Sequence, residues 1–392
     1  MTRAIHARYF GEEGKLFSLY IKTALLTLLT LGIYRFWART RIRKYIWSAT
    51  SADDDSFEYT GTGLEKLLGF LVAIVILAIY LGVVQMLLFY FGLNLFTEPT
   101  NQVQALAQIG AIYITLFAVM PLVFFAQYRA RRYKLARTRW RGIRFAMETG
   151  AWGYAFRAIG YYLVTILTLG LLWPLATFRL EKYMADRSWY GDGQFVQNGR
   201  WQSLYKGMKH VFIGLAIMIG GGVLAAMMQS DFFAVAIAVG YIWIAVGVVS
   251  YRVYAFNYLT NNKVLDGQVT FDATVKTGEV VKNVIIGGLA ITVIMAVIFG
   301  IVSAVVTGIA QSLMTGGVPA TLIVVIALLY GAAMLTAGGL GLVMITQPII
   351  AHAVNSIEFQ NADHLTTIRQ RAADAGADAE GFADALDVGG AI

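Results

Sequence analysis

The residues of this chain that could do chemistry are mainly basic side chains mixed with aromatic ones. The densest group covers 129–144, "RARRYKLARTRWRGIR". Arginine and lysine beside tyrosine and tryptophan are typical of surfaces that bind anionic groups. The four histidines lack a paired metal-binding spacing, and there is no cysteine to act as nucleophile or metal ligand. The sequence therefore predicts anion contact, with no catalytic residues, no metal site and no cofactor.

The composition is that of an integral membrane protein. Hydrophobic residues make up 58% of the chain, charged residues only 14%, and the mean hydropathy is +0.64, whereas soluble domains carry about 25% charged residues. Beside a bilayer, anionic head groups explain the basic cluster better than nucleic acid does. We expect the lipid bilayer, with anionic lipids, as the partner and no nucleic acid. An anionic ligand or a protein partner are alternatives, and a homo-oligomer is left open.

Eight apolar stretches follow one another along the chain. The short tips at 94–104, 229–231 and 310–319 contain none of the 31 lysines and arginines. The positive-inside rule therefore places these tips outside and the basic loops, with both termini, in the cytoplasm. Six stretches fit ordinary spans under this rule: 67–93, 105–126, 208–229, 232–250, 284–308 and 319–347.

The remaining two apolar stretches, 16–37 and 153–177, lie between basic segments on both sides. If they crossed the membrane, many basic residues would face outward, so we expect re-entrant or interfacial segments that break near Gly32 and Gly170. Eight ordinary spans with a weak charge bias are the alternative. The predicted fold class is an all-α polytopic membrane protein with about six spanning helices and two re-entrant or interfacial segments.

Both short stretches belong to an internal duplication at a 138-residue offset. Residues 29–45, "LTLGIYRFWARTRIRKY", match 167–183, "LTLGLLWPLATFRLEKY", at apolar, basic, aromatic and glycine positions. Basic residues of the two copies and of the dense cluster are candidates for contact with anionic lipid or ligand: Arg41, Lys44, Arg131, Arg132, Arg139, Arg179 and Lys182. Four aromatic residues are expected in the interfacial belt: Tyr45, Tyr133, Trp140 and Tyr183.

The duplication also divides the chain. We expect a first membrane repeat (1–150), a second (151–283), a C-terminal membrane hairpin (284–360) and a disordered acidic tail (361–392). Each polar loop is expected to hold a short extended piece, and four such pieces could form a small cytoplasmic sheet. These pieces lie around 56–61, 143–148, 193–199 and 268–274.

The repeat string at 29–45, with "FEYTGTG" and "RARRYKLARTRW", resembles the YjgN-like family of bacterial inner-membrane proteins, a domain of unknown function. The resemblance covers nearly the whole chain up to about residue 360. It implies a multi-pass protein of the bacterial inner (cytoplasmic) membrane. It implies no catalytic or ligand residues.

The main functional hypothesis is a transporter-like or permeation role for a small solute, anionic or lipid-like, because parallel repeats and broken helices occur in transporters. The predicted spans contain no carboxylate, which argues against an ion-coupled pump. The alternative is a non-transporting lipid-binding or scaffold protein that uses its basic cytoplasmic face. An enzyme is not expected, because no nucleophile, base or metal set is visible.

Overall fold

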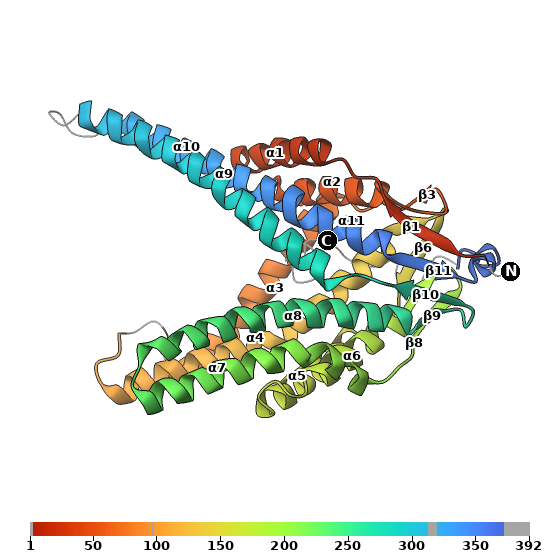
Figure 1. Ribbon diagram of the computed structural model, residues 1–392, viewed down its shortest axis with the longest axis horizontal. Helices are drawn as coiled ribbons and strands as arrows, with labels where there is room; N and C mark the ends of the chain where they lie inside the picture. Colours follow the sequence, from red (N-terminus) through yellow and green to blue (C-terminus); the bar gives the residue numbers. More distant parts are fainter. Residues whose placement is uncertain (1–2, 94, 96–97, 313–319, 372–392) are drawn as a thin grey trace. The chain divides into compact units, whose positions relative to one another are not determined.

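The computed structural model describes residues 3–93, 95, 98–312 and 320–371. Along the chain, pairs of helices alternate with short strands (Figure 1). The first half contains β1 (Ile5–Tyr9), α1 (Glu13–Leu29), α2 (Arg35–Ser48), β2 (Thr50–Ala52), β3 (Asp55–Ser56), β4 (Glu58–Tyr59), α3 (Gly63–Tyr90), α4 (Gln102–Ala136), β5 (Thr138–Trp140), β6 (Ile143–Met147), α5 (Ala151–Leu167) and α6 (Trp173–Ala185).

The second half continues the alternation and ends on a short strand and a turn of 3-10 helix. It contains β7 (Ser188–Tyr190), β8 (Gly193–Gln197), η1 (Trp201–Met208), α7 (Lys209–Met228), η2 (Asp231–Phe233), α8 (Ala234–Asn261), β9 (Lys263–Leu265), β10 (Val269–Ala273), α9 (Thr277–Ser312), α10 (Ala320–Gly341), the π-helical η3 (Leu342–Thr346), α11 (Gln347–Asn355), β11 (Ile357–Gln360) and η4 (Ala362–Thr366).

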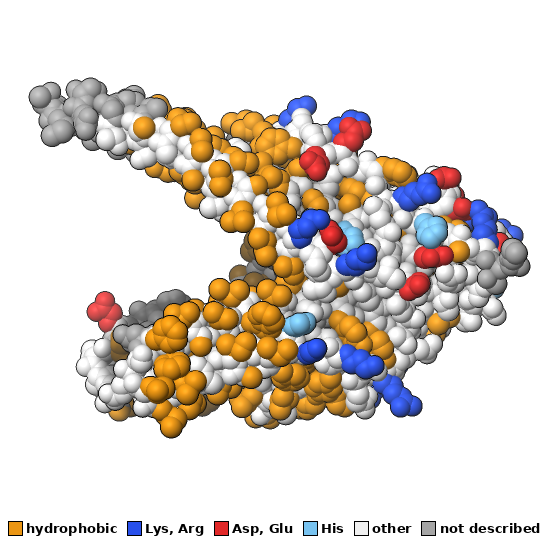
Figure 2. Space-filling model, viewed as in Figure 1, with side chains coloured by type: hydrophobic (Ala, Val, Ile, Leu, Met, Phe, Trp, Pro, Cys, Tyr) orange, Lys and Arg blue, Asp and Glu red, His pale blue; other side chains and the backbone are white. Residues whose placement is uncertain are grey.

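Among the described residues, six helices are long and apolar enough to cross a membrane. Only 6% to 17% of the residues in their most apolar windows are buried, so their apolar side chains need lipid around them. Figure 2 shows hydrophobic side chains over α7, α8 and α9, with charged ones near the strands. The prediction of a polytopic membrane protein is confirmed, with these candidate spans: Gly63–Tyr90, Gln102–Ala136, Trp201–Met228, Ala234–Asn261, Thr277–Ala304 and Val324–Asn355. Most of the predicted tip 310–319 lies outside the described residues.

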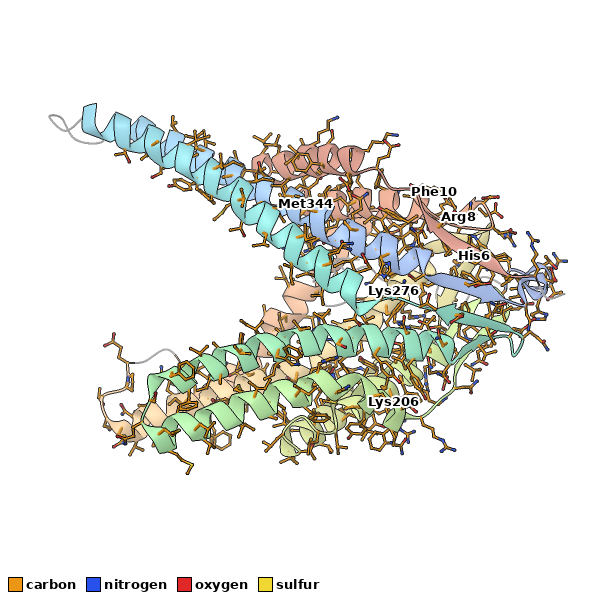
Figure 3. The ribbon with its side chains drawn as sticks, viewed as in Figure 1. His6, Arg8, Phe10, Lys206, Lys276 and Met344 are labelled. Atoms are coloured by element: carbon orange, nitrogen blue, oxygen red, sulfur yellow. The ribbon has the colours of Figure 1, made fainter. Side chains whose placement is uncertain are left out.

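The all-α part of the predicted class is wrong, because eleven strands within the described residues pair in antiparallel fashion. The four extended pieces expected in the loops contain β4, β6, β8 and β10. The other strands have at most five residues, too few for an alternating pattern to stand out in the sequence. The five-residue β1 shows a clear alternation, with Ile5 and Ala7 buried and His6 and Arg8 exposed; Figure 3 labels the two exposed residues.

Each helix pair joins two strands that are themselves neighbours. The strand β1 pairs with β2 across α1 and α2, and β6 pairs with β7 across α5 and α6. The same holds for β4 with β5, for β8 with β9, and for β10 with β11. The strands that flank each helix pair therefore lie one strand spacing apart, about 4.8 Å.

The chain forms two compact units, described here separately. The first takes its residues from 1–56, 204–261 and 271–360, and its strand order is β3-β2-β1-β11 followed by the end of β10. The second takes its residues from 57–203, 262–270 and 361–392, and its order runs from the start of β10 through β9-β8-β7-β6-β5 to β4.

Residues 361–371, the first part of the predicted acidic tail, lie on the second unit. The backbone N–H of Asp192 donates to the carbonyl oxygen of Arg369 at 2.9 Å, and the Arg369 N–H donates to the Asp192 carboxylate at 2.9 Å. His364 Nε2 lies 2.7 Å from a carboxylate oxygen of Asp266. The rest of the predicted tail, 372–392, lies outside the described residues.

Two of the helix pairs are short. The helices α1 and α5 each have 17 residues, about 25 Å, which is less than the hydrocarbon thickness of about 30 Å. Both pairs reverse through two left-handed residues: Leu31 (φ 50°) with Gly32 (φ 93°), and Leu169 (φ 50°) with Gly170 (φ 87°). The leucines at the two tips are 95% and 93% exposed, which suits insertion into lipid.

In the first unit, α7 and α8 pack through glycines spaced seven residues apart. The buried residues of α7 are Gly214 and Gly221, and those of α8 include Gly240 and Gly247. A β-carbon at Gly240 would lie 2.6 Å from the backbone nitrogen of Met218. The two backbones therefore approach more closely than larger residues would allow.

We predict that Gly240→Ala lowers the free energy of unfolding by about 1–3 kcal/mol, because the added methyl group overlaps the α7 backbone. The matched control is Gly220→Ala, whose added carbon would meet nothing within 4 Å. Thermal unfolding of the purified protein in detergent measures both. Equal midpoints for the two variants would contradict this account of the α7 and α8 packing.

Candidate functional site

A groove of about 520 Å³ lies in the first unit between α1, α2 and α10. Its volume falls within the range of small-molecule sites, about 300–1,000 Å³. One wall comes from α1 with Ala24 and Leu28, the turn adds Leu31, and α10 adds Leu335. The groove is therefore mainly apolar and open on one side.

Polar groups of α1 do not change the apolar character of this wall. The Thr23 hydroxyl donates to the carbonyl oxygen of Leu19 at 2.9 Å, and the Thr27 hydroxyl donates to that of Thr23 at 2.7 Å. Because both hydroxyls bond to the helix's own backbone, their hydrogen-bonding capacity is used within α1.

The wall formed by α2 is basic. Arg35 and Arg39 lie one helical turn apart and both line the groove. None of the lining residues recorded for it is acidic. The groove thus combines an apolar interior with two guanidinium groups, which is the character expected of a site for an anionic amphiphile.

The helix α1 is held against α10 by a pair of glycines. A β-carbon at Gly339 would lie 2.8 Å from the ring of Phe17, and one at Gly338 would overlap the hydroxyl of Tyr20. Tyr20 also lines the groove. The small residues of α10 therefore set the separation of the two helices on which the groove depends.

The second short pair carries aromatic rings where the first carries the groove. At the 138-residue offset, Tyr162 corresponds to Ala24 and Trp173 corresponds to Arg35. The Tyr162 ring stacks on Phe124 with centroids 5.2 Å apart, and it meets Trp173 edge-on at 6.3 Å. Side chains of the protein itself thus occupy these positions in the second unit.

A second, smaller cavity of about 380 Å³ lies in the second unit where α4 ends and α5 begins. Arg129, Arg132 and Trp152 line it. The Arg132 guanidinium is buried, and its Nε donates to the carbonyl oxygen of Met147 at 3.0 Å. This arginine therefore serves to hold β6 against α4.

Two other basic residues predicted to contact lipid take part in internal ion pairs. Arg131 donates twice to the Glu181 carboxylate, at 2.6 and 2.9 Å, and Lys263 approaches the same carboxylate at 3.2 Å. Burial alone would raise the pKa of Glu181, but the two cations lower it to about 2. Lys182 lies 2.9 Å from the Asp186 carboxylate and donates to the carbonyl oxygen of Gln197 at 2.6 Å. The remaining candidates are exposed: Arg41, Lys44, Arg139 and Arg179.

The aromatic residues predicted for the interfacial belt hold the ends of helix pairs together. The Tyr45 hydroxyl accepts from the Glu12 N–H at 2.7 Å and donates to the Glu12 carbonyl oxygen at 3.0 Å. The Tyr183 hydroxyl donates to the carbonyl oxygen of Gly150, 138 positions after Glu12, at 3.0 Å. The other two, Tyr133 and Trp140, are buried in the second unit at 0% and 3% exposure.

The histidines make local structural contacts. His352 Nε2 accepts a hydrogen bond at 3.0 Å from the backbone N–H of Lys276, which Figure 3 labels just before α9. In the part of the chain that the structure describes, no three His, Asp or Glu residues gather as a metal ion would need.

Arg35 and Arg39, which line the groove, are not among the basic residues that the sequence indicated as candidates. Those candidates include positions that match at the 138-residue offset, such as Arg41 with Arg179, whereas Arg35 corresponds to Trp173. A comparison of where the two copies differ would have pointed to both arginines.

Stability in acid should depend on Glu181. Its pKa falls from the usual 4.5 to about 2 on folding, so its ion pairs stabilise the fold above pH 4.5 and lose that effect as the pH falls toward 2. We expect Glu181→Gln to cost about 3 kcal/mol at pH 7, with the difference from wild type shrinking between pH 5 and 2. The control Glu12→Gln removes only an exposed ion pair with Lys15. A difference that stays constant with pH, measured by thermal unfolding, would contradict this role.

Long apolar helices with exposed hydrophobic side chains define a polytopic membrane protein. The chain belongs to the family described as bacterial protein of unknown function (DUF898), which matches residues 5–385.

Two relatives of the chain are named inner membrane proteins. The chain is 24% identical over 175 residues to inner membrane protein YjgN of Salmonella typhimurium, covering 42% of this chain and 39% of that protein. Inner membrane protein YjgN of Escherichia coli K12 is 23% identical over 163 residues, covering 42% and 35%. The chain thus spans less than half the length of these relatives. No solved structure matches it.

Proposed function

We propose that the protein moves an anionic, lipid-like solute in the bacterial inner membrane, in a transporter-like or permeation role. The groove between α1, α2 and α10 is the observation that carries this proposal, because it joins an apolar interior to Arg35 and Arg39. A permeation role without ion coupling fits the six candidate spans, in whose most apolar windows at most two charged residues occur.

The two short helix pairs would act as half-inserted hairpins. Their length of about 25 Å is at the lower limit for crossing the hydrocarbon core, and the strands at both ends of each pair are neighbours. Their tips carry exposed apolar residues, among them Leu29 (78%), Leu31 (95%), Leu167 (81%) and Leu169 (93%). Such hairpins would disturb one leaflet beside full spans, and this favours the passage of an amphiphile. Against the alternative of eight ordinary spans stands the pairing of β1 with β2 and of β6 with β7, which returns each short pair to its starting side.

Matching element bounds support the proposed duplication. The strands β1 and β6, the helices α1 and α5, and the strands β2 and β7 begin and end 138 residues apart. We propose that the repeat divides the chain as expected from the sequence, and that the basic strand side with both termini faces the cytoplasm.

Single cysteines test this orientation, because the chain has no cysteine of its own. We expect an impermeant thiol reagent to label Thr100→Cys in intact spheroplasts, and Ser56→Cys and Asn198→Cys only after lysis. All three positions are exposed. Labelling of Ser56→Cys in intact spheroplasts would contradict the proposed orientation.

Reconstitution tests the transport proposal. Protein in liposomes should make a fluorescent anionic phospholipid of the inner leaflet accessible to an external quencher, whereas empty liposomes should not. Replacing both tip leucines, Leu31→Glu and Leu169→Glu, should abolish this activity, because burying a charge in the hydrocarbon costs about 2.5–3.5 kcal/mol. Phe10→Glu is the matched control, since Phe10 is exposed on the strand side (60%). No movement by the wild-type protein would reject the proposal.

The alternative, a non-transporting lipid-binding or scaffold protein, is favoured by the exposed basic residues Arg41, Lys44, Arg139 and Arg179. It requires that neutralising these four residues together removes co-purified anionic lipid while the fold is kept. Unchanged lipid content, measured by mass spectrometry, would reject this alternative.

A further inference from the structure

We infer that the α1–α2 groove is a binding site for one anionic phospholipid of the bilayer, and that the first hairpin alone provides it. The inference rests on the proposed function and narrows it to a lipid, a groove and two arginines. The acyl chain would lie along Ala24 and Leu28 of α1, and the head group at Arg35 and Arg39.

The position of the groove relative to the hairpin tip suits a phospholipid. Leu31, at the tip, is 95% exposed and apolar, which places it in the acyl region of the leaflet. Arg35 and Arg39 follow Leu31 by four and eight residues, about 6 and 12 Å back along the helix. The lining arginines therefore come near the level of the phosphates when the tip is inserted, where each contributes roughly a fivefold gain in affinity for an anionic lipid.

The second hairpin, formed by α5 and α6, allows a comparison with the groove of the first within the same chain. It has the same length and the same left-handed turn at Leu169 and Gly170. Yet Tyr162 stands where the groove has Ala24, and it packs on Phe124 and Trp173. Bulky rings thus take the place of the apolar wall, and Trp173 takes the place of the first arginine.

The experiment uses a phosphatidylglycerol with a photoactivatable group on its acyl chain, with the full chain in lipid nanodiscs. After illumination, mass spectrometry locates the labelled residues. We expect labelling on α1 between Thr23 and Leu31 and near Leu335. A phosphatidylcholine probe with the same acyl chain should label these residues about fivefold less for each arginine that its neutral head group fails to engage.

Two kinds of variant test the apolar wall and the two arginines separately. Ala24→Tyr imitates the second hairpin and should remove the labelling of α1. Arg35→Gln and Arg39→Gln should each lower labelling by the anionic probe about fivefold and leave the phosphatidylcholine signal unchanged. Lys22→Gln, an exposed position on α1 outside the groove, and Tyr162→Ala, in the second hairpin, are controls that should leave the labelling of α1 by the anionic probe unchanged.

Several outcomes would overturn the inference. These are equal labelling by both lipids, labelling that persists in Ala24→Tyr, or displacement of the probe by a water-soluble anionic amphiphile but not by added phosphatidylglycerol. Thermal unfolding shows whether Ala24→Tyr still folds, and the arginine variants keep the test valid if it does not. Because labelling needs no transport, labelled α1 without lipid movement rejects the proposed function alone, and movement without labelled α1 rejects this inference alone.

Discussion

Backbone pairing between short strands is the constraint on which the rest of this fold depends. Every helix pair connects two neighbouring strands, as α1 and α2 connect β1 to β2. The strands at the two ends of each pair therefore lie one strand spacing apart, about 4.8 Å. A helix pair held in this way must leave and return on one side, whether its helices have 17 residues or 36. Long pairs of this kind have the length and apolar composition to cross the bilayer and come back, and the short pairs fit the partial insertion proposed above.

The same constraint explains why charged residues stabilise one part of the fold and small residues another. Strand backbones cannot lie in lipid with unpaired edges, so the strands and the charged residues that tie them together belong outside the hydrocarbon. The Glu181 carboxylate, bonded to Arg131 and Lys263, lies at this end of the second unit. Within lipid, the helices pack through small residues instead, as α7 and α8 do at Gly214 and Gly240.

The sequence predicted the spans well and the strands poorly, for physical reasons. A span needs about 20 apolar residues and is visible in composition alone. A strand such as β2, Thr50–Ala52, has three residues and is defined by its backbone partners, which composition does not record. Buried polar partners were equally hidden: Arg131 and Arg132 read as a basic surface cluster, although Glu181 and the Met147 carbonyl oxygen bind them.

Different residues of the two short hairpins hold the fold and line the groove. Positions kept in both, such as Tyr45 and Tyr183, bond to the residue that precedes the first helix of their own hairpin. Each of these bonds closes the base of one hairpin. At the same 138-residue offset, Arg35 of the groove corresponds to Trp173 and Arg39 to Thr177. The matched tyrosines therefore hold the scaffold, whereas the arginines of the proposed lipid site stand where the two hairpins differ.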